Sequence, residues 1–219
     1  MTQLAPFDAE ARDQALCIRG ALHPDAADAL PGMGTLLLLG PDEPAFWPVF
    51  AASPEKADGA PHPMDRWSKR VVGALATRWG GQALFPYDGP PWHPFLRWAT
   101  ASGRCHPSPV GLLVHDAAGL MVSFRGAVAL PRRLDLQPPS ESPCHTCSTQ
   151  PCATACPVGA LAPGKDYDVA ACRDHVRSAA GVDCRTGGCL VRRACPVSQR
   201  LSRSAEQAAF HMAAFAGPA

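Results

Sequence analysis

The chain has 219 residues, 47% of them hydrophobic, and a formal net charge of +1. This length allows one large domain or two small ones with a buried core. The near-neutral charge gives no reason to expect nucleic acid or a membrane surface as a partner. No stretch reaches the roughly 18 apolar residues of a membrane span. The first residues lack the basic and apolar regions of a secretory signal, so we expect a cytoplasmic protein without a membrane span.

Residues 1–139 are expected to form a small α+β or α/β domain that binds a cofactor or a partner. An amphipathic helix is predicted over residues 8–20, with Asp8 as its cap and Gly20 at its end. The apolar run Thr35–Gly40 is typical of a strand buried on both faces. Further short elements are predicted as a helix near Phe46–Ala52, a strand over Ala83–Tyr87 and a helix over Pro94–Ser102.

A longer helix is predicted over Met64–Trp79. Apolar side chains recur there every four positions, which gives the helix one buried stripe: Trp67, Val71, Leu75 and Trp79. Further along, the runs Gly111–His115 and Leu120–Phe124 flank a turn at Asp116–Gly119 and predict a β-hairpin. Proline- and serine-containing residues 131–143 are typical of a domain boundary.

Eight of the ten cysteines lie in the segment that follows this boundary. Their pattern is Cys144-x2-Cys147-x4-Cys152-x3-Cys156-Pro157, then Cys172, and then Cys184-x4-Cys189-x5-Cys195-Pro196. Eight thiolates match the demand of two [4Fe–4S] clusters, and in bacterial two-cluster ferredoxins the cysteine before proline ligates the other cluster. The pattern therefore predicts a protein that moves single electrons between two buried clusters.

The expected organisation of the second half is a ferredoxin-like dicluster module over residues 140–201 and a C-terminal helix within 202–219. Asp168 is positioned to cap a helix that carries Cys172 inward. Ser204 and Gln207 fit a capping box for a helix that runs to about Phe215.

Two other uses of the cysteines have to be weighed. Two structural zinc sites would also take eight cysteines, but zinc prefers paired Cys-x2-Cys motifs, and only Cys144 and Cys147 have that spacing. Disulfides are disfavoured in a reducing compartment. The isolated Cys17 and Cys105 are expected to be core residues.

The order and spacing of these eight cysteines resemble the C-terminal half of epoxyqueuosine reductases and reductive dehalogenases. The resemblance implies one cluster on the first three cysteines plus the last, and a second cluster on the other four. By position these sets are Cys144, Cys147, Cys152 and Cys195, and then Cys156, Cys172, Cys184 and Cys189. This chain departs from the family pattern in the longer Cys147-to-Cys152 interval and in a stretched second motif.

The segment RWATASGRCHPSPVGLLVHDAAGLMVSFRGA also resembles the end of the corrinoid-binding domain of those reductases, an α/β fold related to flavin nitroreductases. The resemblance implies an alternative function as a corrinoid- or flavin-dependent reductase, in which the clusters deliver electrons to cobalamin or flavin held by the N-terminal domain. Asp88 lies near the family's acidic proton donor but out of register, and the N-terminal domain is shorter than in the reductases. An electron carrier with a protein redox partner is the first hypothesis, and no catalytic residue is assigned.

A few other residues are candidates for function. His106 and His115 could contact a cofactor or a metal, although a structural role is more usual, and His145 is an improbable iron ligand beside eight cysteines. Arg125 could bind phosphate or pair with carboxylates. Three arginines flank the second motif and could offset cluster charge or attract an acidic partner: Arg185, Arg192 and Arg193. No motif for ordinary nucleotide binding, hydrolysis or zinc proteolysis is present.

Overall fold

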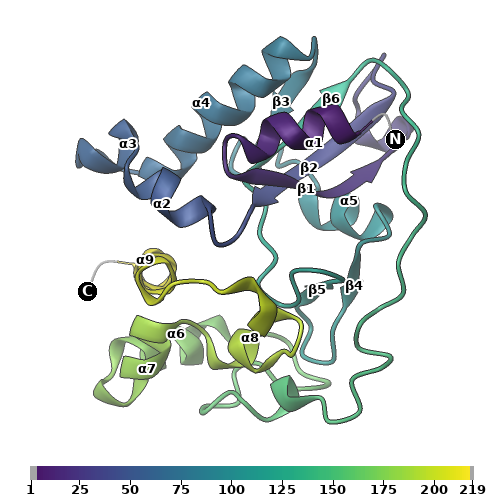
Figure 1. The fold of residues 1–219 in the computed structure, drawn as a ribbon. Helices are drawn as coiled ribbons and strands as arrows, with labels where there is room; N and C mark the ends of the chain where they lie inside the picture. Colours follow the sequence, from purple (N-terminus) through teal and green to yellow (C-terminus); the bar gives the residue numbers. More distant parts are fainter. Residues whose placement is uncertain (1–3, 218–219) are drawn as a thin grey trace. The chain divides into compact units, whose positions relative to one another are not determined.

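The computed structural model describes residues 4–217, which form two compact units (Figure 1). Within the described residues, the first unit comprises 4–105 and 123–140, and the second comprises 106–122 and 141–217. Residues 106–122 are predicted to belong to the N-terminal domain, whereas the structure groups them with the cysteine region. The reason is apolar packing, because Val110, Val114 and Leu120 share a buried cluster with residues of the cysteine region.

The first unit is a four-stranded antiparallel sheet with helices packed on it. Its helices are α1 (Ala5–Arg12), α2 (Phe46–Ala51), α3 (Pro54–Ala57), α4 (Pro63–Arg78) and α5 (Phe95–Ala101), with a 3-10 turn η1 (Ala26–Asp28). Its strands are β1 (Leu16–Leu22), β2 (Thr35–Pro41), β3 (Gln82–Leu84) and β6 (Gly126–Leu130). The strand order is β1-β2-β6-β3, and each of these pairs is antiparallel, so the chain is α+β.

The centre of this sheet is buried on both faces. Every residue of β2 and of β6 is buried, as the continuous apolar run Thr35–Gly40 predicted for β2. Helix α4 packs on β6 and β3, while α1 and α5 pack on β1. Figure 1 shows α4 above the sheet and α5 below it. Parts of both faces of the sheet are therefore shielded from water.

Helix α4 confirms the prediction from apolar periodicity. Trp67, Val71 and Leu75 are buried, and Trp79 at its C-terminal cap is half-buried. Trp67 meets Phe46 and Phe50 of α2 edge to face, with ring centroids 5.4 and 6.1 Å apart. Such pairs contribute about 0.5–1.5 kcal/mol beyond the burial of their area. The short helices predicted near Phe46–Ala52 and Pro94–Ser102 are confirmed as α2 and α5.

The predicted helix over residues 8–20 is wrong in its second half and in its cap, because α1 begins at Ala5 and Asp8 lies inside it. Helix α1 ends at Arg12, and Leu16–Leu22 forms the edge strand β1. Ala15 separates the two with a left-handed φ of 55°. Pairing of β1 with the fully buried β2 decides the conformation here, because a long-range partner outweighs local helix periodicity. The predicted strand over Ala83–Tyr87 is also shorter and displaced, since β3 covers Gln82–Leu84.

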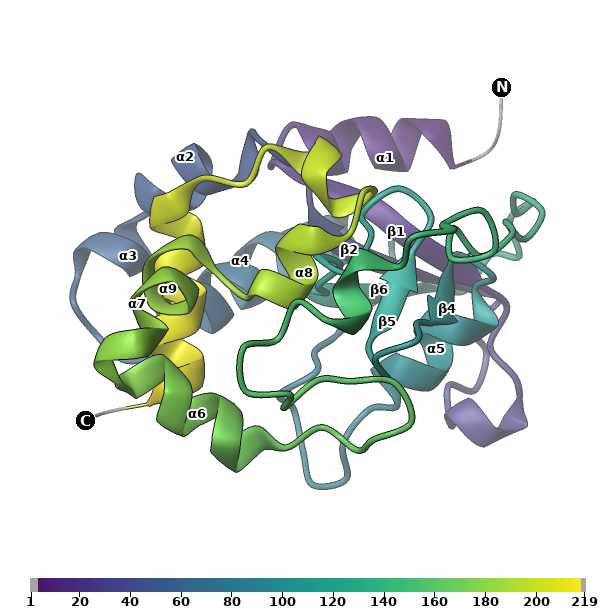
Figure 2. The ribbon, with the colours of Figure 1, turned by 90° about the horizontal axis from the view of Figure 1, so that it is seen from below.

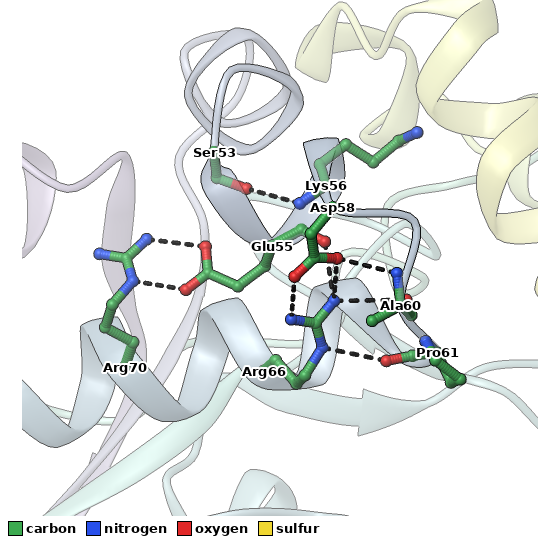
Figure 3. A network of polar contacts seen from close by, with 8 residues as sticks. All are labelled: Ser53, Glu55, Lys56, Asp58, Ala60, Pro61, Arg66 and Arg70. Atoms are coloured by element: carbon green, nitrogen blue, oxygen red, sulfur yellow. Dashed lines mark hydrogen bonds and ion pairs between the residues drawn. The ribbon is translucent and has the colours of Figure 1, made fainter.

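A network of ion pairs joins α3 to α4 (Figure 3). Arg66 donates to both carboxylate oxygens of Asp58 at 2.7 Å and to the carbonyl oxygen of Pro61 at 3.0 Å. One turn further, Arg70 makes a second bidentate pair with Glu55. Two parallel N–H···O bonds fix orientation as well as charge, so the two arginines fix α3 in position against α4.

The second unit has little sheet and consists of short helices and loops. Its strands are β4 (Cys105–Pro107, at the junction of the two units) and β5 (Leu113–His115). Its helices are α6 (Val169–Arg177), α7 (Val182–Gly187), α8 (Leu190–Ala194) and α9 (Ala205–Ala216), with 3-10 turns η2 (Pro151–Ala153), η3 (Ala179–Gly181) and η4 (Ser198–Leu201). Helices α6, α7 and α9 pack together (Figure 2). Asp168 caps α6 and Ser204 caps α9, as predicted.

The predicted hairpin around the turn Asp116–Gly119 is only half correct. The turn exists, because His115 and Gly119 exchange two backbone hydrogen bonds of 3.0 and 2.8 Å. The second arm, Leu120–Phe124, is not a strand, and β5 pairs with β4 instead. Two arginines from the C-terminal part of the second unit donate hydrogen bonds to carbonyl oxygens of the expected arm. Arg192 donates to that of Leu120, and Arg203 donates to that of Met121.

The α3–α4 network generates a test by titration. Hydrogen bonds from Arg66 are the largest cause that lowers the pKa of Asp58 to about 2 from an ordinary 3.8, and the N–H of Ala60 adds to this. A lowered carboxyl pKa means that the pair stabilises the fold above pH 3.8 and that this contribution is lost as pH falls through about 2. We expect Arg66→Gln to raise the pKa of Asp58 toward 3.8 in a ¹³C NMR titration of side-chain carboxylates.

The matched control for this titration is Arg70→Gln. That variant removes the other bidentate pair on the same helix face and should leave the pKa of Asp58 near 2. If Arg66→Gln also left the pKa of Asp58 near 2, the arginine would not be the cause of the shift.

Candidate metal centres

Four of the cysteines line one cavity of about 420 Å³ in the second unit, and we call them the first quartet: Cys144, Cys147, Cys152 and Cys195. Cys144 and Cys147 lie in the loop that leads into η2, Cys152 lies in η2, and Cys195 follows α8. The backbone of this loop turns at Gln150, which has a left-handed φ of 38°. Cys152 and Cys195 are buried, and the other two are half-buried.

The thiols of the first quartet lie close enough to affect one another electrostatically. Burial raises the pKa of the Cys152 thiol, and negative charge on Cys144, Cys195 or Cys147 raises it further. Burial also raises the pKa of the Cys144 thiol, while a hydrogen bond with Ser142 lowers it. The quartet therefore consists of thiols that are close neighbours in space, although one of them comes from the far end of the cysteine region.

The remaining four cysteines form a second group of neighbours, the second quartet: Cys156, Cys172, Cys184 and Cys189. Burial raises the pKa of Cys172, a hydrogen bond with Tyr167 lowers it, and charge on the other three members raises it. Burial also raises the pKa of Cys184, a hydrogen bond from the Leu190 N–H lowers it, and charge on Cys189 raises it again.

The secondary structure explains how these thiols reach one another. Helix α6, capped by Asp168, carries Cys172, and α7 carries Cys184. Cys189 and Cys195 are the residues that begin and end α8. Each cysteine that precedes a proline thus belongs to a different group from the cysteines nearest to it in sequence. Cys156 belongs to the second quartet, and Cys195 belongs to the first. The assignment of these two sets of cysteines to two clusters stays a prediction.

The electrostatics limit what these groups can do. Neighbouring thiolates would repel one another, and burial together with this repulsion raises the pKa of the Cys152 and Cys172 thiols, which disfavours their charged forms. A bound metal reverses this, because a coordinating thiol is deprotonated outright. An all-thiol donor set fits iron–sulfur clusters and zinc, and it does not suit hard cations such as Mg²⁺ and Ca²⁺. Among residues 4–217, no three His, Cys, Asp or Glu side chains form a group that could hold a single metal ion.

The three arginines of the second motif have different partners. Arg185 donates to the carbonyl oxygens of Val176 at 2.7 Å and Ser178 at 3.1 Å, which ties α7 to the end of α6. Arg193 pairs with Asp183 at 2.7 Å, and its charge lowers the pKa of Cys184. Arg192, as described, bonds the Leu120 carbonyl. Of the three, Arg193 therefore acts electrostatically on a quartet thiol.

The two histidines that were considered as ligands lie outside both quartets. Nδ1 of the buried His115 accepts from the N–H groups of Ala117 at 2.9 Å and Ala118 at 3.1 Å, so this ring stabilises the Asp116–Gly119 turn. His106 lies on β4, and its Nε2 is buried. His145 is exposed on the loop between two first-quartet cysteines.

The other residues that the sequence singled out lie in the first unit. Cys17 and Cys105 are buried, as predicted for core residues, and burial raises the pKa of Cys17 to about 11. Asp88 forms an ion pair with Lys69 at 2.9 Å, and Arg125 donates its backbone N–H to the Leu39 carbonyl.

Sequence reasoning missed the contribution of residues 106–122 to the first quartet. Gly119, with a φ of +56°, lies against it: a Cβ there would be 3.0 Å from Sγ of Cys195 and 2.5 Å from the backbone N of Ser198. Ser108 lines the same cavity as the four thiols. The glycine that ended the predicted turn was a visible signal, but nothing local in the sequence showed that it packs on a cysteine some 75 positions away.

No protein-family description matches the chain, and neither a curated protein nor a solved structure matches it. In the part of the chain that the structure describes, no helix combines the length and apolar character needed to cross a membrane.

The contact at Gly119 generates a prediction about the first quartet. Gly119→Ala places a side chain on a left-handed backbone and against Cys195, so we expect a loss of about 2–4 kcal/mol in the free energy of unfolding. Gly111→Ala is the matched control, because Gly111 has a φ of +76° and nothing within 4 Å of the added Cβ. It should cost only the backbone strain of about 1–2 kcal/mol. Urea denaturation under anaerobic conditions measures both, and equal losses would contradict the contact.

Proposed function

We propose that this protein binds two [4Fe–4S] clusters and transfers single electrons between a donor and an acceptor protein. The observation that carries the proposal is the partition of eight thiols into two quartets. Cys156, which precedes Pro157, belongs to the second quartet, and Cys195, which precedes Pro196, belongs to the first. This crossed arrangement is typical of two-cluster ferredoxins. When bound, each cluster would supply one-electron redox chemistry.

In this proposal the protein's own residues hold the clusters, exclude water and adjust their potentials. Three of the ligands are at most 7% exposed: Cys152, Cys184 and Cys195. A thiolate at such a buried position is favourable only where the positive charge of a metal compensates it. Hydrogen bonds near sulfur tune cluster potentials, and Ser142, Tyr167 and the N–H of Leu190 already bond quartet thiols. The charge of Arg193 beside Cys184 would add to this effect at the second quartet.

The finer architecture is part of the same proposal. The second unit would be a ferredoxin-like dicluster module, and the first unit, which we propose resembles the nitroreductase and corrinoid-reductase type, would recognise the partner. Relationship to epoxyqueuosine reductases and reductive dehalogenases stays a prediction, as does a cytoplasmic location. The alternative to this proposal is that the two quartets are structural zinc sites, because zinc also accepts four thiolates.

The crossed assignment predicts which substitutions act on the same cluster. Cys147→Ser and Cys195→Ser should both weaken or abolish the first cluster, and Cys184→Ser should affect the second, because each removes one thiolate of its quartet. Iron content and EPR spectra of the anaerobically reduced variants measure this. The assignment would be wrong if Cys147→Ser and Cys195→Ser altered different EPR signals.

The same samples separate an electron carrier from a corrinoid-dependent reductase. EPR of the protein mixed with cob(II)alamin should show the spectrum of the free cofactor together with reduced cluster signals. A change to a protein-bound, base-off cob(II)alamin spectrum would overturn the carrier and favour the reductase.

A further inference from the structure

One side chain in the cavity of the first quartet has a hydrogen-bonding group that finds no partner among residues 4–217. Ser108 is 8% exposed and lines the cavity with the four thiols. Its Oγ is buried and has no hydrogen-bond partner among the described residues. Ser142, by contrast, lies beside the same quartet and accepts from the N–H of Cys144 at 3.3 Å.

The backbone around Ser108 is fixed in place. The N–H of Ser108 donates to the carbonyl oxygen of Leu112 at 2.9 Å, and its own carbonyl oxygen accepts from the N–H of Gly111 at 3.0 Å. Pro107 and Pro109 on either side restrict the chain further. The hydroxyl is therefore presented by a rigid turn.

A buried hydroxyl without a partner is unfavourable, and native proteins satisfy nearly all such groups with protein, water or a bound group. The acceptors that a cluster would bring into this cavity are the cysteine thiolates and the sulfides. A serine hydroxyl can donate to either while its oxygen needs no further bond. The unsatisfied donor and the sulfur acceptors at this cavity thus complement each other.

We propose that Ser108 donates a hydrogen bond to a sulfur of the cluster held by the first quartet and thereby raises the reduction potential of that cluster. This inference rests on the proposed function. Reduction adds negative charge to the cluster, so a donor beside sulfur stabilises the reduced form more than the oxidised form. Ser108 is a positioning residue that sets the potential of one cluster and not of the other.

The test is an EPR-monitored redox titration of the anaerobically purified full-length chain. Ser108→Ala should lower the ratio of reduced to oxidised first cluster at a fixed potential by about threefold to tenfold, where tenfold is about 59 mV for a one-electron couple. Ser108→Thr keeps the hydroxyl and should retain the wild-type potential. Ser68→Ala is the matched control, because it removes a buried hydroxyl of the first unit that donates to the Met64 carbonyl at 2.8 Å.

The Cys147→Ser and Cys184→Ser variants identify which EPR signal belongs to which quartet. An unchanged first-cluster potential in Ser108→Ala, an equal shift of both clusters, or an equal shift in Ser108→Ala and Ser108→Thr would each overturn the inference and leave the proposed function intact. Wild-type protein without iron and acid-labile sulfide would instead refute the proposed function itself, and the inference would fall with it.

Discussion

Repulsion between buried thiolates is the constraint on which the second unit depends. Each quartet brings together four thiols that have to lose their protons before they bind metal. The four thiolates then carry like charge, and burial makes that charge still less favourable. Charge on a neighbouring thiol raises the pKa of Cys152 and of Cys172. The thiols can therefore lie together either as protonated groups or as ligands of a cationic centre, and the second state turns repulsion into attraction.

The rest of the second unit is consistent with a fold organised around such centres. Its helices span only 5 to 12 residues, and isolated helices of that length are marginal in water. Its apolar clusters are small and include the cysteines themselves, with Cys152 and Cys195 in one and Cys184 in the other. Residues 106–122 complete the first of these clusters, and Arg192 and Arg203 hold that segment through its carbonyl oxygens.

The sequence predicted what depends on local pattern and missed what depends on distant contacts. Helix α4 and strand β2 followed from spacing and burial, because their apolar residues repeat with the period of the element. Strand β1 lies in a segment whose local pattern predicts a helix, because its conformation depends on pairing with β2. The expected strand after Gly119 failed because arginines some 70 to 80 residues away take its carbonyl oxygens.

The candidate site shows the same division. The cysteine spacing and the two Cys-Pro pairs were sufficient to name eight candidate ligands, and the structure places four of them around one cavity. The supporting residues were out of reach, because Ser108 and Gly119 meet the first quartet only through folding, and Tyr167 is recognised only by its bond to Cys172.

The central claim is that the two quartets hold iron–sulfur clusters. The most direct measurement is metal and acid-labile sulfide analysis of anaerobically purified wild-type protein, combined with Mössbauer spectroscopy. The account predicts iron and sulfide in equal amounts, sufficient for two [4Fe–4S] clusters per chain. Zinc bound at two sites per chain, without sulfide, would contradict it.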